Sequence, residues 1–225
     1  MSIIEPVRAE RNHPGEVKKH SAAIRFWHWG NTLIISGSLI TVLINSTLTD
    51  RKGITTLVKN SLQGKVVIIT DDQAGAISHN LEDKVWGIHI WFGYALAALF
   101  LFRILLEYFQ LADQKFIPKL REAYKAYTNT KLKRERTLHE LTVKIIYAGF
   151  YFVLFIMVIT GLFLAFEDLL SPFKAIRHTV KEVHGFCMYL VLAFIVVHLV
   201  GVFLAERKDS SGIVSDMING GKSLS

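Results

Sequence analysis

The sequence predicts an all-α integral membrane protein, a bundle of four transmembrane helices. Two observations carry this prediction. The chain of 225 residues is 51% hydrophobic, with a mean hydropathy of +0.34, which is more apolar than an ordinary soluble domain. Its apolar residues gather in four long windows, and the basic residues behind the net charge of +7 stand in blocks between them. A nucleic-acid-binding protein, with its basic residues on one face, is therefore not predicted.

Each predicted span has about the 20 mostly apolar residues that cross the hydrocarbon core of a bilayer. The spans are residues 24–45, 85–106, 143–166 and 183–204, which together make one membrane domain, residues 24–204. The remaining segments are an N-terminal tail (1–23), three loops (46–84, 107–142 and 167–182) and a C-terminal tail (205–225). No apolar signal-peptide core precedes His20, so we expect the first span to stay as an uncleaved anchor.

The first loop contains two short local patterns. The run VVIIT at Val66–Thr70 predicts a short strand. The sequence DDQAG that follows predicts a turn. Together they predict that this loop folds into a small ordered cap.

Lysine and arginine counts orient the bundle. Basic residues concentrate in the N-terminal tail and the second loop, which the positive-inside rule places in the cytoplasm. The basic residues of the first loop are offset by acidic ones, so this loop is predicted to be extracytoplasmic, and four spans bring both termini to the cytoplasmic side. The basic residues of the cytoplasmic segments are Arg8, Arg11, Lys18 and Lys19 in the tail and Lys115, Lys119, Arg121, Lys125, Lys131, Lys133, Arg134 and Arg136 in the loop.

Four of the nine histidines fall inside predicted spans: His28, His89, His184 and His198. Any one of them alone is explained as a packing or interfacial residue. Four ionisable residues on three helices at membrane depth require a shared reason. Solvated surface positions are predicted for the remaining histidines, except that His139 beside Glu140 could relay a proton or act as an alternative ligand. These remaining histidines are His13, His20, His79, His139 and His178.

The spacing of the span histidines pairs them by depth. His184 and His198 are fourteen positions apart, which at about 100° per residue returns them to one helix face, roughly 21 Å apart along the axis. His89 starts the inward-running second span and matches the outer His184. His28 starts the first span at the cytoplasmic side and matches His198.

Two facing imidazoles in a helical bundle suit a planar tetrapyrrole, whose iron takes one nitrogen from each side. We therefore predict two haems, the inner one on His28 and His198 and the outer one on His89 and His184. Without a CxxCH motif the haems are b-type, the lone Cys187 excludes iron–sulfur clusters, and zinc lacks a convergent ligand set.

Three arginines are placed to meet haem propionates through charge-assisted hydrogen bonds. Arg25 and Arg103 stand at the inner level and Arg177 at the outer level. For Arg103, snorkelling of a long side chain to the membrane surface is an equally good account.

The chain resembles the cytochrome b561-like membrane di-haem cytochromes b, most closely the b-type cytochrome subunit of nickel–iron hydrogenases, which is related to the gamma subunits of formate dehydrogenases. The resemblance rests on RFWHW in the first span, GIHIWFGYALAALFLFR in the second, TGLFLAF in the third, HGFCMYLVLAFIVVH in the fourth and GIVSDMINGGK in the tail. Carried over position by position, the family's haem ligands fall on His28, His89, His184 and His198.

The resemblance implies an electron-transfer subunit of a respiratory oxidoreductase complex in the prokaryotic cytoplasmic membrane. It would pass electrons between an extracytoplasmic partner, an iron–sulfur or haem protein of hydrogenase-like type, and quinone as acceptor or donor. Two alternatives stay open: a free-standing quinone-reducing cytochrome that oxidises superoxide or another small reductant, and a haem-free membrane anchor for a catalytic subunit, whose histidines only pack. The spans show no polar path or paired broken helices, so a transporter is disfavoured.

Overall fold

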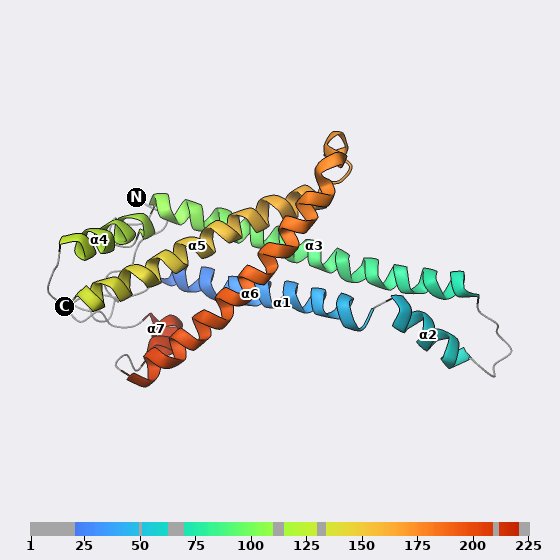
Figure 1. Cartoon of the computed structure of the whole chain (residues 1–225), viewed down its shortest axis with the longest axis horizontal. Coiled ribbons are helices and arrows are strands. Elements are labelled where there is room, and N and C mark those ends of the chain that lie inside the picture. The colour runs from blue at the N-terminus through green and yellow to red at the C-terminus, as the bar shows by residue number, and fades with distance from the viewer. Residues whose placement is uncertain are drawn as a thin grey trace. The chain divides into compact units, whose positions relative to one another are not determined.

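The computed structural model describes residues 21–49, 51–62, 70–109, 115–129, 134–208 and 212–220, and within these ranges all regular structure is helical (Figure 1). Most of the segment predicted as a strand, residues 66–69, lies outside the described residues. The helices are α1 (Ala22–Thr47), α2 (Arg51–Leu62), α3 (Asp71–Phe109), α4 (Phe116–Asn129), α5 (Arg134–Ala165), the 3₁₀ helix η2 (Ser171–Ile176), α6 (Arg177–Lys208) and α7 (Ile213–Asn219).

Three helical stretches are long and apolar enough to cross a membrane: Asp71–Phe109, Thr137–Ala165 and Ser171–Arg207. A fourth candidate is the pair Ala22–Thr47 and Lys52–Leu62, which is bent by 60° and counts only if both helices form one span. The described residues therefore hold three candidate spans, or up to four. The predicted class of all-α membrane protein is confirmed.

The chain divides into two compact units, and the first comprises Met1–Trp29 and Leu99–Ser225. In this unit α5 packs against α6, and α4 packs against α5 (Figure 1). The short helices η2 and α7 both contact α6. Aromatic rings join α5 to α6, with Phe150 stacked on Phe194 at 4.1 Å between ring centres.

The second unit, Gly30–Ala98, contains most of α1, all of α2 and the first part of α3. Helices α1 and α3 approach each other closely at Gly37, where an added Cβ would lie 2.5 Å from Cζ of Phe92. A side chain at this position would force the Phe92 ring to move. Towards the end of α1, the Asn45 amide donates to the Glu82 carbonyl oxygen at 3.5 Å.

The start of α3 corrects one sequence prediction, because DDQAG is the first turn of a helix and not an isolated turn. Thr70 and Gln73 form a capping box: the Gln73 amide donates to Thr70 Oγ1 at 3.2 Å, and the Thr70 amide donates to Gln73 Oε1 at 3.0 Å. Asp71 and Asp72 in the first turn favour the positive end of the helix dipole. Helix α3 therefore begins fourteen residues before the predicted span.

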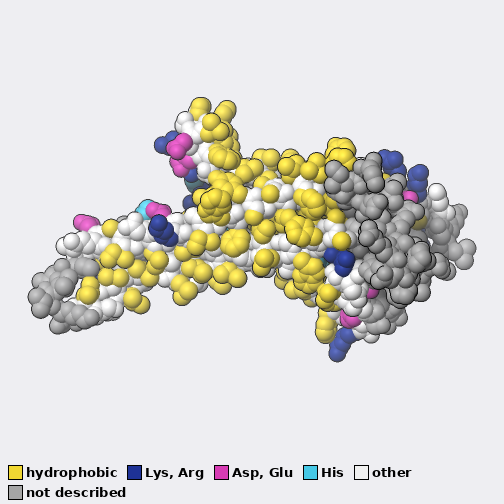
Figure 2. Space-filling view, turned by 180° about the vertical axis from the view of Figure 1, so that it is seen from behind, with side chains coloured by type: hydrophobic (Ala, Val, Ile, Leu, Met, Phe, Trp, Pro, Cys, Tyr) yellow, Lys and Arg dark blue, Asp and Glu magenta, His cyan; other side chains and the backbone are white. Residues whose placement is uncertain are grey.

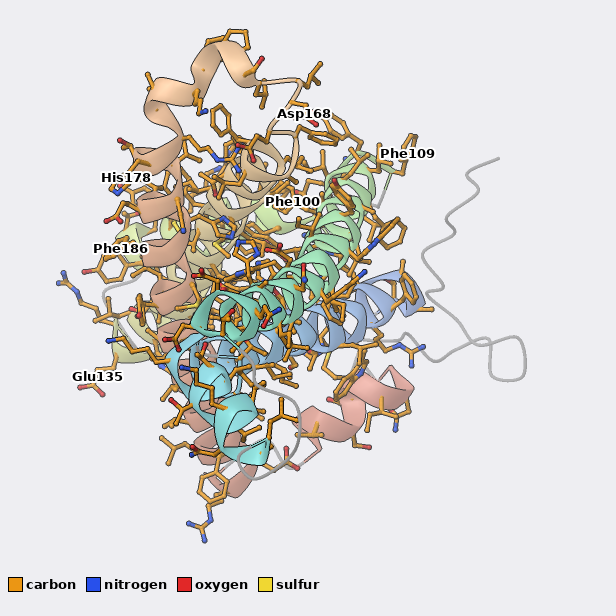
Figure 3. The ribbon with its side chains drawn as sticks, turned by 90° about the vertical axis from the view of Figure 1, so that its right-hand side faces the viewer. Phe100, Phe109, Glu135, Asp168, His178 and Phe186 are labelled. Atoms are coloured by element: carbon orange, nitrogen blue, oxygen red, sulfur yellow. The ribbon has the colours of Figure 1, made fainter. Side chains whose placement is uncertain are left out.

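Helix α6 shows the lipid-facing character of the molecule most clearly. Phe186, Tyr189 and Val196 are each more than 60% exposed, which is the pattern of a helix whose outer face meets lipid instead of water. On the face shown in Figure 2, hydrophobic side chains cover the helices and charged side chains gather towards helix ends. Figure 3 shows His178 and Phe186 on the outer side of α6.

Candidate functional site

Two of the predicted ligands lie close together within the first unit. The rings of His28 on α1 and His198 on α6 have their centres 6.2 Å apart, with 57° between the ring planes. An iron bound to one nitrogen of each ring, with bonds of about 2 Å, would hold the ring centres roughly 6 Å apart. The donor set and its spacing therefore fit a bis-histidine haem, and the assignment of the two ligands stays a prediction.

The His198 ring is held by aromatic side chains from two helices. Phe194, one turn earlier on α6, stacks on it at 5.7 Å with 8° between the planes. From α5, the Tyr147 hydroxyl lies 3.5 Å from His198 Nδ1, and the Phe150 ring stacks on Phe194. These contacts restrict how far the imidazole can turn.

His184 lies fourteen residues before His198, on the same face of α6. It contacts Thr160 and Gly161 of α5. Thr160 Oγ1 is 2.9 Å from His184 Nδ1. A Cβ on Gly161 would lie 3.3 Å from His184 Cε1, tighter than an ordinary contact. The TGLFLAF motif thus gives His184 both a polar partner and room for its ring.

His89 belongs to the second unit, on α3, and its polar neighbours come from α1. Thr41 Oγ1 is 2.9 Å and Ser38 Oγ is 3.3 Å from His89 Nδ1. Trp86 makes an edge contact with the ring at 5.3 Å. The predicted pairing of His89 with His184 at an outer haem stays a prediction.

The Arg103 side chain forms hydrogen bonds with other side chains of the protein. Its Nε donates to the Tyr151 hydroxyl at 3.2 Å, and its Nη1 donates to Glu107 Oε2 at 3.1 Å. Its guanidinium carbon also lies 6.0 Å from the Trp27 ring centre and 5.4 Å from that of Tyr151, within the range of cation–π attraction. Two of its five N–H groups are used by these bonds, and its role towards a propionate stays a prediction.

Glu107 links this cluster to the start of α4. Its carboxylate accepts hydrogen bonds from the backbone amides of Phe116 at 3.0 Å and Ile117 at 3.1 Å. Free amides at a helix start are satisfied by such an acceptor, and a negative charge there favours the helix dipole. One carboxylate thus joins the end of α3 to α4.

The other two arginines also contact protein groups. Arg177 pairs with Glu167, Nη2 to Oε2 at 2.7 Å, at the turn between α5 and α6. Arg25 donates through Nη1 to the Ile218 carbonyl oxygen, and Trp29 Nε1 donates to the Met217 carbonyl oxygen at 3.0 Å. The start of α1 therefore binds the C-terminal end of α7, close in sequence to His28.

The remaining histidines divide into two groups. His79 and His178 are exposed and lie 2.8 Å from Asp83 and 3.9 Å from Glu182, and His139 is exposed on the first turns of α5. His13 and His20 lie outside the described residues. Within the described ranges, no group of three or more His, Cys, Asp or Glu residues could hold a metal ion.

Sequence reasoning missed the polar partners of the histidines and of Arg103. These partners are Thr41, Thr160, Tyr147 and Glu107. A hydroxyl group inside an apolar span was the available signal, because polar side chains at membrane depth need a partner. Which histidine each hydroxyl meets depends on how the helices pack.

Apolar helices of spanning length, with imidazoles inside them and one pair spaced for an iron, define the class of helical-bundle membrane cytochromes. The chain belongs to the prokaryotic cytochrome b561 family, whose model matches residues 19–220. Proteins of this family are four-helix, multi-pass membrane proteins that bind haem b and transfer electrons, typically beside oxidoreductases of the hydrogenase type. Comparisons with curated proteins and with solved structures found no match.

Proposed function

We propose that this chain is a di-haem cytochrome b that carries electrons across the cytoplasmic membrane between an extracytoplasmic redox subunit and the quinone pool. The inner haem is bound by His28 and His198, and the outer haem by His89 and His184. The single observation that supports it most is the 6.2 Å distance between the ring centres of His28 and His198. Each haem iron, when bound, accepts and releases one electron.

The chain's own residues orient the ligands. Phe194 and Tyr147 limit the rotation of His198, and Thr160 and Thr41 hold His184 and His89. Apolar helix faces around the imidazoles provide a low-dielectric setting, and burial of this kind is one of the ways a protein sets a haem potential.

The quinone reaction is proposed at the cytoplasmic end, near His28 and His198. Reduction of one quinone to quinol takes two electrons and two protons, so the electrons arrive one at a time and the protons come from the cytoplasm. His139 and Glu140, at the exposed start of α5, are proposed to pass those protons inward. Quinol oxidation would reverse each step.

Quinone-driven oxidation of the reduced haems tests this function. The protein, reduced with a slight excess of dithionite in liposomes, is mixed with short-chain benzoquinone or naphthoquinone, and the haem absorption bands are followed. We expect rapid oxidation in the wild type and in His89→Ala, which keeps the inner haem. We expect slow oxidation in His198→Ala.

Two results would contradict the proposal. One is that neither quinone oxidises the haems of the wild type. The other is equal rates in the two variants, which would remove the assignment of the quinone reaction to the His198 end. His178→Ala, which changes an exposed histidine on the same helix, is the matched control and should behave as the wild type.

A further inference from the structure

We propose that Thr41 and Thr160 are positioning residues that fix the tautomer and the ring orientation of His89 and His184. The inference rests on the proposed function, because it concerns the histidines assigned there to the outer haem. Each threonine meets its histidine in the same way, on a different pair of helices: Thr41 on α1 with His89 on α3, and Thr160 on α5 with His184 on α6.

The single proton of each hydroxyl decides the direction of the contact. A threonine hydroxyl has one proton to donate and two lone pairs to accept with. Thr41 Oγ1 donates to the Ser38 carbonyl oxygen at 2.6 Å, which uses that proton. The same oxygen lies 2.9 Å from His89 Nδ1. With its proton used at the carbonyl oxygen it accepts at this contact, which assigns the hydrogen of the imidazole to Nδ1.

The same accounting holds at the second threonine. Thr160 Oγ1 donates to the Ile156 carbonyl oxygen at 2.6 Å, one turn back along α5. It lies 2.9 Å from His184 Nδ1 and accepts from it. Thr41 on α1 and Thr160 on α5 therefore make the same arrangement. In each, the hydroxyl donates to a carbonyl oxygen of its own helix and accepts from a histidine with a lone pair.

This arrangement selects the histidine tautomer that can bind iron through Nε2. In a neutral imidazole one nitrogen carries the hydrogen and the other a lone pair. With the hydrogen fixed on Nδ1, Nε2 of His89 and of His184 holds the lone pair that binds a metal. A hydrogen bond accepted from the far ring nitrogen of a ligand is also what orients the ring and raises its basicity.

Glycines beside both threonines leave the space that this arrangement needs. Gly161 follows Thr160, and a Cβ there would lie 3.3 Å from His184 Cε1. Gly37 lies one turn before Thr41, and a Cβ there would meet the Phe92 ring at 2.5 Å. Close approach of the helices brings each hydroxyl within reach of its imidazole.

His198 is held differently. Its Nδ1 lies 3.5 Å from the Tyr147 hydroxyl, a distance at the limit of a hydrogen bond, and that hydroxyl has a proton free to rotate towards either partner. The hydroxyl acceptors of His89 and His184 should therefore raise the basicity of those rings more than the Tyr147 hydroxyl raises that of His198. A more basic ligand favours ferric iron and lowers the midpoint potential.

Redox titration of the purified full-length protein, with low-spin ferric EPR spectra of the oxidised form, tests the inference. Thr160→Val and Thr41→Val keep the side-chain shape and remove the acceptor. We expect each to raise the midpoint potential of one haem, the same haem in both, and to shift its EPR signal. Thr160→Ser and Thr41→Ser keep the hydroxyl and should restore the wild-type values.

Two controls make the result specific. Thr47→Val removes a hydroxyl that is bonded back to the Leu43 carbonyl oxygen on α1 at 2.6 Å, without a described histidine contact, and should leave both potentials unchanged. Ser38→Ala combined with Thr41→Val removes the second hydroxyl near His89 Nδ1, at 3.3 Å, and should raise the potential at least as far as Thr41→Val alone.

The outcomes separate the inference from the function on which it rests. If His184→Ala and His89→Ala each remove the same haem but the valine variants leave its potential and EPR signal unchanged, the positioning role is wrong and the ligand assignment stands. If His184→Ala or His89→Ala keeps both haems, the ligand assignment is wrong and the inference falls with it.

Discussion

The ion pair between Arg103 and Glu107 offers a perturbation whose size follows from the structure. In Glu107→Ala the guanidinium of Arg103, whose side chain is only 9% exposed, loses its carboxylate. Removing one partner of a buried pair costs about 3–5 kcal/mol, and losing an acceptor at a helix start adds about 1 kcal/mol. Because the Glu107 side chain is 20% exposed, water offsets part of this loss, and we expect a destabilisation of about 3 kcal/mol.

The double variant Arg103→Met/Glu107→Ala separates the ion pair from the helix cap. Removing both charges leaves no unpaired cation, so the double variant should be more stable than Glu107→Ala alone. The assay is the midpoint of denaturant unfolding in detergent, followed by circular dichroism. The control is Glu135→Ala, an exposed carboxylate in the first turn of α5 (Figure 3), whose stability should change by less than about 0.5 kcal/mol.

The reasoning would be refuted by strict additivity. If the destabilisations of Glu107→Ala and of Arg103→Met, each measured alone, sum to that of the double variant, Arg103 and Glu107 do not stabilise each other. The destabilisation by Glu107→Ala would then come from the start of α4 alone.

Three smaller perturbations test other contacts. Gly37→Ala should lower stability by about 1–3 kcal/mol, measured as above, because its Cβ would overlap the Phe92 ring. Gly220→Ala places a side chain at φ 104°, which costs about 1–2 kcal/mol locally, and should increase hydrogen exchange in α7 without changing the haem content. Tyr147→Phe removes a weak 3.5 Å contact to His198 but keeps the ring, so both haems should stay and the potentials should change less than in Thr160→Val.

The spans were predictable because a membrane helix requires a continuous apolar run of about 20 residues, which is visible in the local sequence. The predicted spans 85–106 and 183–204 lie inside candidate spans, and 143–166 extends one residue beyond the candidate Thr137–Ala165. The helices begin before those runs, at Asp71, Arg134 and Arg177, because polar residues also form the first turns of each helix. Hydropathy alone does not detect this extension.

The error at DDQAG has a specific physical cause. Asp and Gly there suggest a turn when taken as single residues. Thr70 and Gln73 exchange two hydrogen bonds across the first turn and convert the same letters into a helix start. The pattern T-x-x-Q was present in the sequence, so this element was predictable by a closer reading.

The surroundings of the histidines were not predictable in the same way. Fourteen-residue spacing places His184 and His198 on one face of one helix without any knowledge of the other helices. That Thr160 meets His184, or that Tyr147 meets His198, depends on how α5 packs against α6. Likewise the arginines were predicted from charge alone, and the sequence does not show that Glu107 and Glu167 contact Arg103 and Arg177.

The central claim is that four histidines hold two haems, and the haem-to-protein ratio tests it most directly. Purified wild type, His198→Ala, His89→Ala and the control His178→Ala are compared by their oxidised and dithionite-reduced spectra and by extracted haem per chain. The account predicts low-spin b-type bands with two haems in the wild type and the control, and one haem in each of the other two. A colourless wild type, or ligand variants that keep both haems, would contradict it.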